Sequence, residues 1–161
     1  MQVTPTVLPE VLVIEPTVHG DHRGFFYEAW NRAEFDELVG GPIEFVQDNY
    51  SRSVAGVVRG IHYQLPSPQG KLVRCTRGVV QDVAVDLRRS SERFLRWTDV
   101  ELSEDNFRQL WIPPGFGHGF SVLSDVAELA YKATGFYAPE HDRVVAWNDP
   151  ALIKKAYDVG A

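Results

Sequence analysis

Short segments rich in Val, Ile, Tyr, Phe and Trp follow one another along the chain, and Gly, Pro, Asp or Ser separates most of them. These two groups of residues favour strands and turns respectively. The segments read VLVIEP, FVQDNYS, VVRGIHYQ, KLVRCTRG, VVQDVAVDLR, TDVELS, QLWIPP, GFSVLS and ELAYKATGFYAP. Many short strands at even spacing predict an all-β fold, either a sandwich or a barrel.

The segment VVQDVAVDLR indicates what the interior of that fold contains. Because side chains alternate along a strand, Asp82 and Asp86 share one face and Val83 and Val85 share the other. One face is therefore expected to look into a polar space. A barrel of this size either fills its interior with side chains or opens to hold one small ligand.

Two short peripheral helices are predicted. In NRAEFDELVGG, Asn31 can cap the first turn, Glu34 follows three residues later, and Gly40 begins the stop signal. A second helix is expected in NDPALIKKAY, with Asp149 as its cap and Pro150 in its first turn.

Composition restricts the class of protein. The 161 residues, 44% of them apolar, suit one domain covering residues 1–161. A net charge of -6 without a basic run argues against nucleic-acid binding. The single cysteine, Cys75, suits a reducing compartment. Because no apolar run reaches the roughly 18 to 20 residues of a membrane span, and the N-terminus lacks signal-peptide features, we expect a soluble, cytoplasmic protein with no membrane contact.

His62, in RGIHYQLPSPQGK, can be a packed core residue, a metal ligand or a proton carrier. The metal-binding pattern of cupins begins with Gly56 and His62, but Gln64 replaces its second histidine and no glutamate follows at the expected place. Pro113, Gly115 and His118 in PPGFGHGF match the second half of the pattern. Of the usual four metal ligands only His62 and His118 remain, and the neutral amide of Gln64 is a poor substitute for an imidazole or a carboxylate. We therefore expect no metal and no other cofactor.

An acid–base role for the polar residues is the alternative. An imidazole, with an ordinary pKa of about 6.5, can accept and return a proton near neutral pH, whereas a tyrosine hydroxyl is a better donor than acceptor. His62 and Tyr131 on opposite sides of a pocket, with Lys71 near a developing oxyanion, would suit epimerisation beside a carbonyl. A core His62 bonded to a backbone carbonyl would give the same pattern, so both interpretations stay open at this point.

Eight motifs carry a resemblance to a known family. They are GDHRGFFYEAW, FVQDNYSRS, VVRGIHYQ, QGKLVRC, GVVQDVAVDLR, LSEDNFRQLWIPPGFGHGF, LAYKATGFYAP and WNDPAL. The match as a whole runs from about Leu8 to Leu152. In order and spacing they resemble the dTDP-4-dehydrorhamnose 3,5-epimerase family. The resemblance implies a metal-free cupin jelly-roll β-barrel, a dimer, and epimerisation of dTDP-4-keto-6-deoxy-D-glucose at C3 and C5 on the route to dTDP-L-rhamnose.

The same resemblance implies roles for individual residues. His62 would be the base, Tyr131 the acid on the opposite face, and Lys71 the cation that stabilises the enolate oxygen. Arg59 would hold the diphosphate, which suits a planar guanidinium. The other implied substrate-binding residues are Arg23, Phe26, Glu28, Gln47, Asn49, Asp82, His118, Tyr137 and Trp147.

The resemblance also implies a homodimer in which the N-terminal segment crosses to the neighbouring subunit. Arg23, Phe26 and Glu28 would then hold the nucleotide of the partner's site, and Gln47 and Asn49 would line the same pocket. Arg23 could instead be a solvated turn residue. No nucleic acid or membrane is implied as a partner.

The sequence departs from the family pattern after WNDPAL, where it reads IKKAYDVGA. There the family carries a tail whose Asp pairs with the catalytic histidine, and we expect Asp82 to be the internal substitute for that carboxylate. The departure has three possible explanations: a short variant with altered or reduced activity, an epimerase of only C3 or C5 from an antibiotic deoxysugar pathway, or a sequence given without its tail. The expected function is inversion at C3, C5 or both, and the alternative from another class is a dTDP-sugar-binding cupin with impaired catalysis.

Some polar and aromatic residues have structural interpretations. Asp86 and Arg88 are expected to form an ion pair, and Trp97 and Trp111 to lie in the core because curved sheets need large apolar side chains.

Overall fold

The computed structural model describes residues 1–152 as a succession of short strands with the α-helix α1, the 3-10 helix η1 and a helical stretch at 150–152. The elements are β1 (Gln2–Pro5), β2 (Leu12–Glu15), β3 (His19–Asp21), β4 (Gly24–Phe26), α1 (Arg32–Val39), β5 (Gln47–Val54), β6 (Val58–Gln64), β7 (Lys71–Arg77), β8 (Val79–Asp86), β9 (Trp97–Ser103), β10 (Gln109–Ile112), β11 (Phe116–Val122), β12 (Val126–Ala133), η1 (Pro139–His141) and β13 (Asp142–Val144).

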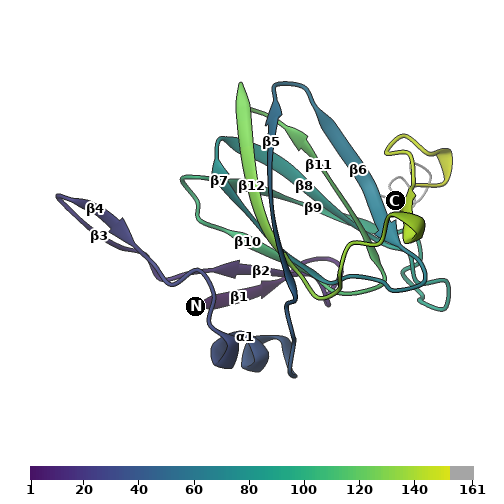
Figure 1. Cartoon of the computed structure of the whole chain (residues 1–161), viewed down its shortest axis with the longest axis horizontal. Helices are drawn as coiled ribbons and strands as arrows, with labels where there is room; N and C mark the ends of the chain where they lie inside the picture. The colour runs from purple at the N-terminus through teal and green to yellow at the C-terminus, as the bar shows by residue number, and fades with distance from the viewer. Residues whose placement is uncertain (153–161) are drawn as a thin grey trace.

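Two antiparallel sheets face each other (Figure 1). One has six strands in the order β1-β2-β10-β7-β12-β5, and the other has five in the order β13-β6-β11-β8-β9. Within residues 1–152 no strand pairing joins the two sheets, so they form a sandwich and do not close into a hydrogen-bonded barrel. The prediction of an all-β fold is confirmed.

The main core fills the space between the sheets. Val73, Leu110 and Leu129 of the six-stranded sheet meet Val80 and Leu102 of the five-stranded sheet, and all five are almost completely buried. Burial of this kind stabilises by roughly 25 cal/mol for each Å² of apolar surface removed from water.

Strand β8 alternates as its sequence predicts. Asp82 and Asp86 are fully buried on the inner side, whereas Val83 and Val85 belong to an apolar cluster with Ile61 on the outer face of the five-stranded sheet. The inner face of β8 therefore brings carboxylates into the space between the sheets.

Helix α1 covers the outer face of the six-stranded sheet. Asn31 caps it, because its Oδ1 accepts a hydrogen bond from the backbone N–H of Glu34 at 3.3 Å, and Gly40 ends it in the left-handed conformation. Phe35 of α1 packs edge-on against Trp111. The predicted first helix and the core position of Trp111 are both confirmed.

The second predicted helix begins where the sequence indicated. Residues 150–152 are helical, and Asp149 Oδ1 accepts the backbone N–H of Ala151 at 2.8 Å. The remainder of NDPALIKKAY lies outside the described residues. Trp97 was expected in the core, and this was wrong: its side chain is 37% exposed, because it starts the edge strand β9 on the outer face.

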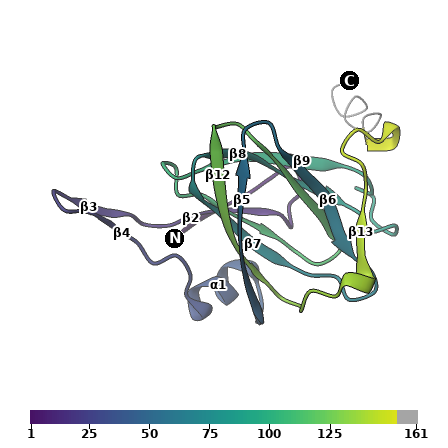
Figure 2. The ribbon, with the colours of Figure 1, turned by 45° about the horizontal axis from the view of Figure 1, so that its top comes forward.

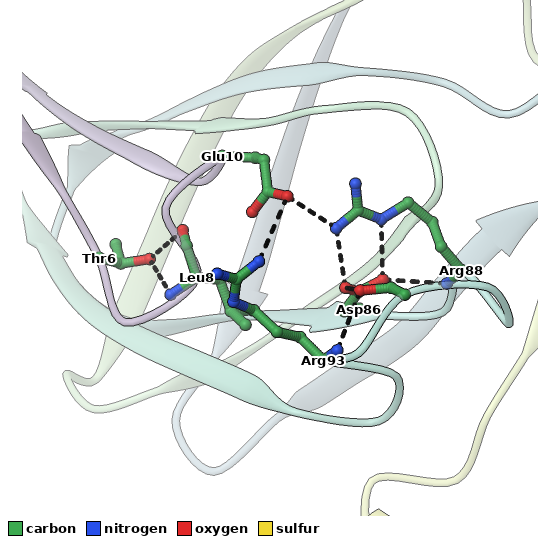
Figure 3. A network of polar contacts seen from close by, with 7 residues as sticks. Thr6, Leu8, Glu10, Asp86, Arg88 and Arg93 are labelled. Carbon is green, nitrogen blue, oxygen red and sulfur yellow. Dashed lines mark hydrogen bonds and ion pairs between the residues drawn. The ribbon is translucent and has the colours of Figure 1, made fainter.

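A polar network fastens the N-terminal loop to the segment after β8 (Figure 3). Arg88 donates to Asp86 at 2.8 Å and to Glu10 at 3.0 Å, so the predicted ion pair of Asp86 and Arg88 is confirmed. Burial alone would raise the pKa of Asp86, but hydrogen bonds from Arg88 and Ser91 outweigh it and bring the pKa below its ordinary value.

The hairpin of β3 and β4 projects from the sandwich on the side away from β13 (Figures 1 and 2). Phe25 and Phe26 are both exposed on it, and Phe26 is 72% exposed. Such apolar exposure on a projecting hairpin is typical of a contact surface.

No helix in the described part of the chain is long and apolar enough to cross a membrane. The expected cytoplasmic location stays a prediction.

Candidate active site

A cavity of about 240 Å³ opens between the two sheets and collects most of the predicted polar residues. The five-stranded sheet contributes side chains from β6, β11 and β13, and the six-stranded sheet contributes β5, β7 and β12. The lining residues are Ser51, Arg59, His62, Tyr63, Gln64, Gln69, Lys71, His118, Gly119, Phe120, Tyr131, Tyr137 and Asp142.

A bulge at Gly60 brings Arg59 and His62 to the same face of β6. His118 of β11 pairs with His62 and Phe120 pairs with Arg59, so β6 has one residue more than β11 over this stretch. A Cβ on Gly60 would lie 2.5 Å from the carbonyl oxygen of His118, and φ is +99°. Only glycine fits this position without strain. The bulge cancels the strand alternation that would otherwise point Arg59 away from the cavity.

His62 has a carboxylate beside it. Its Nδ1 lies 3.6 Å from Oδ1 of Asp142, an ion-pair distance slightly longer than a hydrogen bond. The contact arises because β13 pairs with β6, with Asp142 opposite Gln64 and Val144 opposite His62. Sequence reasoning missed Asp142. Its only signal was its place just after the motif that ends YAP.

Asp82 does not support His62, contrary to the expectation from the sequence. Both of its carboxylate oxygens lie within hydrogen-bond distance of His118 Nε2, at 3.0 and 2.9 Å, and Asp82 is fully buried. The reason is strand order: β8 pairs with β11, where Asp82 lies opposite Phe120, and β11 separates it from β6. Asp82 and His118 therefore form their own pair at the back of the cavity.

Lys71 extends into the cavity from the start of β7. Burial lowers the pKa of its ammonium group, and the carboxylates of Asp82 and Asp142 oppose that effect. Its Nζ lies 5.9 Å from the ring centroid of Tyr131. A lysine here can interact with a negative charge that forms between the two sheets.

Tyr131 faces the cavity from β12, in the sheet opposite to His62. Burial raises the pKa of its hydroxyl, Arg59 opposes the rise, and Asp142 and Tyr137 add to it. The phenol therefore stays protonated near neutral pH and can donate a proton.

Arg59 is held by the edge of the six-stranded sheet. Its Nε donates to Ser53 Oγ at 2.8 Å and its Nη2 donates to the backbone oxygen of Arg52 at 3.4 Å. Arg59 also lines the cavity, so its guanidinium can bind an anion there.

Tyr137 lies at the mouth of the cavity with its side chain 54% exposed. Gln47, which was expected to contact substrate, instead accepts the backbone N–H of Tyr137 at 2.9 Å through Oε1 and donates to Asn49 at 2.8 Å. Neither Gln47 nor Asn49 lines the cavity, and Asn49 borders a separate hollow beside Trp30 and Lys132.

Four other predicted site residues lie elsewhere in this subunit. Trp147 borders an apolar groove on the outer face of the five-stranded sheet together with Trp97. Arg23 pairs with Asp21 at 2.6 Å on the projecting hairpin, near Phe26, and Glu28 follows the hairpin in an exposed position. None of these side chains lines the cavity of its own chain.

In residues 1–152 no three His, Cys, Asp or Glu side chains come together in an arrangement that could hold a metal ion. Gln64, at the position where a metal cupin has its second histidine, directs its amide to backbone groups of two loops.

Comparisons with known proteins agree with this geometry. The family model for dTDP-4-dehydrorhamnose 3,5-epimerase matches residues 5–156. A Pseudomonas aeruginosa protein named dTDP-4-dehydrorhamnose 3,5-epimerase is 57% identical over 152 residues, which are 94% of this chain and 84% of that relative. A Streptomyces niveus protein named dTDP-4-dehydrorhamnose 3-epimerase is 39% identical over 94% of this chain and 74% of the relative.

A solved structure gives the same result at the level of the fold. The crystal structure of dTDP-6-deoxy-D-glucose-3,5-epimerase from Legionella pneumophila, in complex with dTDP-4-keto-L-rhamnose, superposes with a TM-score of 0.92 at 50% identity. The match covers 94% of this chain and 80% of that one. The cupin-like jelly roll predicted from the sequence is confirmed.

Proposed function

Because the chain belongs to the dTDP-4-dehydrorhamnose 3,5-epimerase family, we propose that it epimerises a dTDP-4-keto-6-deoxyhexose at C3, C5 or both. One observation carries the proposal. A histidine from one sheet and a protonated tyrosine from the other line the same cavity, with a lysine between the sheets. This is the set of groups that inversion beside a ketone requires.

His62 acts as the base in this proposal. It removes the hydrogen on the carbon next to the ketone as a proton, and the electron pair of the C–H bond moves onto the ketone oxygen as an enolate. Lys71 stabilises that oxygen, because a cation in a water-poor cavity interacts strongly with developing negative charge. Tyr131 then donates its hydroxyl proton to the carbon from the opposite face, and the centre is inverted. His62 releases the proton that it took to solvent and Tyr131 regains one from solvent, which restores both groups.

Asp142 supports the base in this scheme. A carboxylate 3.6 Å from Nδ1 favours the imidazolium that forms when His62 takes the proton. The Coulomb attraction at that distance is about 1 kcal/mol in water and grows as the substrate excludes solvent. Asp142→Asn should therefore lower kcat about fivefold to tenfold with a small change in KM, while Asp99→Asn on the distant strand β9 should change neither. Equal kcat values for Asp142→Asn and the unaltered protein would remove Asp142 from the scheme.

The diphosphate of the substrate is assigned to Arg59. The support is its position at the cavity edge, with Nε already oriented by Ser53. Arg59→Lys should raise KM more than it lowers kcat, because a lysine cannot make two parallel hydrogen bonds to phosphate oxygens.

We further propose that the protein works as a homodimer whose N-terminal hairpins cross between subunits. Two observations support this. The hairpin exposes Phe25 and Phe26 away from its own cavity, and β5 forms one end of the six-stranded sheet within the described residues. Arg23, Phe26 and Glu28 of one subunit would then reach the nucleotide of the other. Phe26→Asp should shift the protein towards monomer in sedimentation experiments and weaken dTDP binding.

Deuterium exchange tests the function directly. In deuterated water with dTDP-4-keto-6-deoxyglucose, NMR should show deuterium entering at C3, C5 or both, and His62→Ala should abolish the exchange. Exchange at C3 alone would favour a monofunctional enzyme, which the similarity to the Streptomyces niveus 3-epimerase makes the second candidate. Binding of dTDP without exchange at either carbon would contradict the enzymatic proposal and leave a dTDP-sugar-binding protein.

A further inference from the structure

The segment 135–138, which carries Tyr137, is held at the cavity mouth by glutamine side chains. It lies between the end of β12 and the start of η1 and belongs to neither sheet. Backbone groups outside regular structure still need hydrogen-bond partners. Here each of the four residues of the segment forms one backbone hydrogen bond with the side-chain amide of a glutamine.

Gln64 makes the central contacts. Its Oε1 accepts the backbone N–H of Ala138 at 2.9 Å, and its Nε2 donates to the backbone oxygens of Phe136 at 3.3 Å and Ser67 at 3.1 Å. The side chain is only 4% exposed. A primary amide is suited to this position because it donates and accepts at once, whereas an imidazole, a carboxylate or an apolar group cannot satisfy all three partners.

Two further glutamines hold the segment on either side of that contact. Gln69 Nε2 donates to the backbone oxygen of Gly135 at 2.6 Å, and Gln47 Oε1 accepts the backbone N–H of Tyr137 at 2.9 Å. The three glutamines come from β5, β6 and the loop before β7, and so from both sheets. We call Gln47, Gln64 and Gln69 the glutamine clamp.

The clamp connects Tyr137 to the strand of the proposed base. Gln64 follows His62 by two residues on the same face of β6, so one strand places both the histidine and the segment that carries the tyrosine. Asp142, beside His62, lies opposite Gln64 on β13. A shift of the segment would therefore move Tyr137 relative to His62.

We propose that Gln64 is a positioning residue, which acts through the clamp to fix Tyr137 over the cavity and thereby sets how the substrate is held. The part of the inference that concerns substrate rests on the proposed function. The part that concerns the backbone segment does not.

Amide hydrogen exchange tests the clamp without any ligand. In Gln64→Met, which keeps the side-chain length, the amide of Ala138 should exchange about tenfold faster by NMR, because it loses its acceptor. Gln81→Met is the matched control, since the side chain of Gln81 donates to Asp99 on the neighbouring strand β9 and does not contact the segment 135–138. It should leave that rate unchanged. Gln47→Met gives a second measurement, with the effect expected at the amide of Tyr137. Unchanged exchange at Ala138 in Gln64→Met would overturn the proposal.

A double-mutant cycle tests whether the clamp acts through Tyr137. Gln64→Met should raise KM about tenfold, with a smaller effect on kcat because Lys71 and Tyr131 keep their places. In a Tyr137→Ala background the same substitution should change KM less than about twofold. A purely structural loss would instead give the same factor in both backgrounds, and this result would refute the positioning role.

The two proposals fail in different ways. If the unaltered protein shows no deuterium exchange at C3 or C5, the proposed function fails, and amide exchange at Ala138 still decides the clamp. If the unaltered protein is active and Gln64→Met matches it in KM and in amide exchange, the clamp is wrong and the function stands.

Discussion

Replacing Gly60 by alanine should disrupt the bulge that places Arg59 and His62 on one face. The new Cβ would lie 2.5 Å from the carbonyl oxygen of His118 and 2.8 Å from the Cα of Gly119, both backbone atoms of the neighbouring strand β11. Backbone atoms of a central strand cannot move aside as a flexible side chain can. The φ of +99° adds a separate strain for any residue with a Cβ.

Gly56 provides the matched control because it carries only one of these two penalties. Its φ is +76°, and a Cβ there would meet nothing within 4 Å. The positive φ should cost roughly 1 to 2 kcal/mol at either site, and the clash at Gly60 should cost roughly a further 1 to 3 kcal/mol. Alanine restricts the unfolded chain equally at both sites, so that contribution cancels in the comparison.

Urea unfolding measured by fluorescence gives the two free energies of unfolding. Gly60→Ala should be less stable than Gly56→Ala by roughly 1 to 3 kcal/mol, and it alone should also lose deuterium exchange under conditions where it is folded. Equal destabilisation of the two variants would refute the clash argument. A stable and fully active Gly60→Ala protein would refute the role of the bulge in placing Arg59 and His62.

Three other predictions follow from single side chains. Tyr131→Phe should retain dTDP binding but lower kcat by roughly a hundredfold or more, since a general acid accelerates a reaction by about 10² to 10⁴. Tyr50→Phe, on the outward face of β5, is the control and should keep its activity. The pKa of Asp86 is lower in the folded protein than its ordinary value of 3.8. Its ion pair with Arg88 therefore stabilises the fold fully above pH 3.8, and this stabilisation is lost as the pH falls through the pKa that Asp86 has in the folded protein. Asp86→Asn should therefore be less stable than the unaltered protein at pH 7, and the gap in urea midpoints should narrow below about pH 4; a gap that stayed constant would contradict this. Burial raises the pKa of the Cys75 thiol to about 11. Thiol reagents at pH 8 should therefore label Cys75 only after unfolding. Rapid labelling of the native protein would contradict this prediction and show that the core opens at Cys75.

Local patterns in the sequence were sufficient to predict the elements that depend on neighbouring residues. The cap at Asn31, the stop at Gly40 and the alternation along β8 each follow from residues within one turn or one strand. The bulge at Gly60 could also be predicted, because a glycine inside a strand pattern indicates a close approach of backbone.

Contacts between distant strands could not be predicted in this way. Asp82 was assigned to the wrong histidine because the order of β6, β11 and β8 in the sheet is not written in any one segment. Asp142 was missed for the same reason, since only the pairing of β13 with β6 brings it to His62. Trp97 was placed in the core from its size alone, although its position at the start of an edge strand leaves it exposed.

The division of the site between two sheets gives a physical reason for inversion. The proposed base lies on β6 of the five-stranded sheet and the proposed acid on β12 of the six-stranded sheet, and both side chains point into the space between them. Facing sheets lie about 10 Å apart, so a ring held between them presents one face to each sheet. Proton removal by His62 and proton return by Tyr131 would then occur on opposite faces. If His62 alone removed and returned the proton, the configuration would be retained. Inversion therefore depends on Tyr131 of the opposite sheet supplying the returning proton.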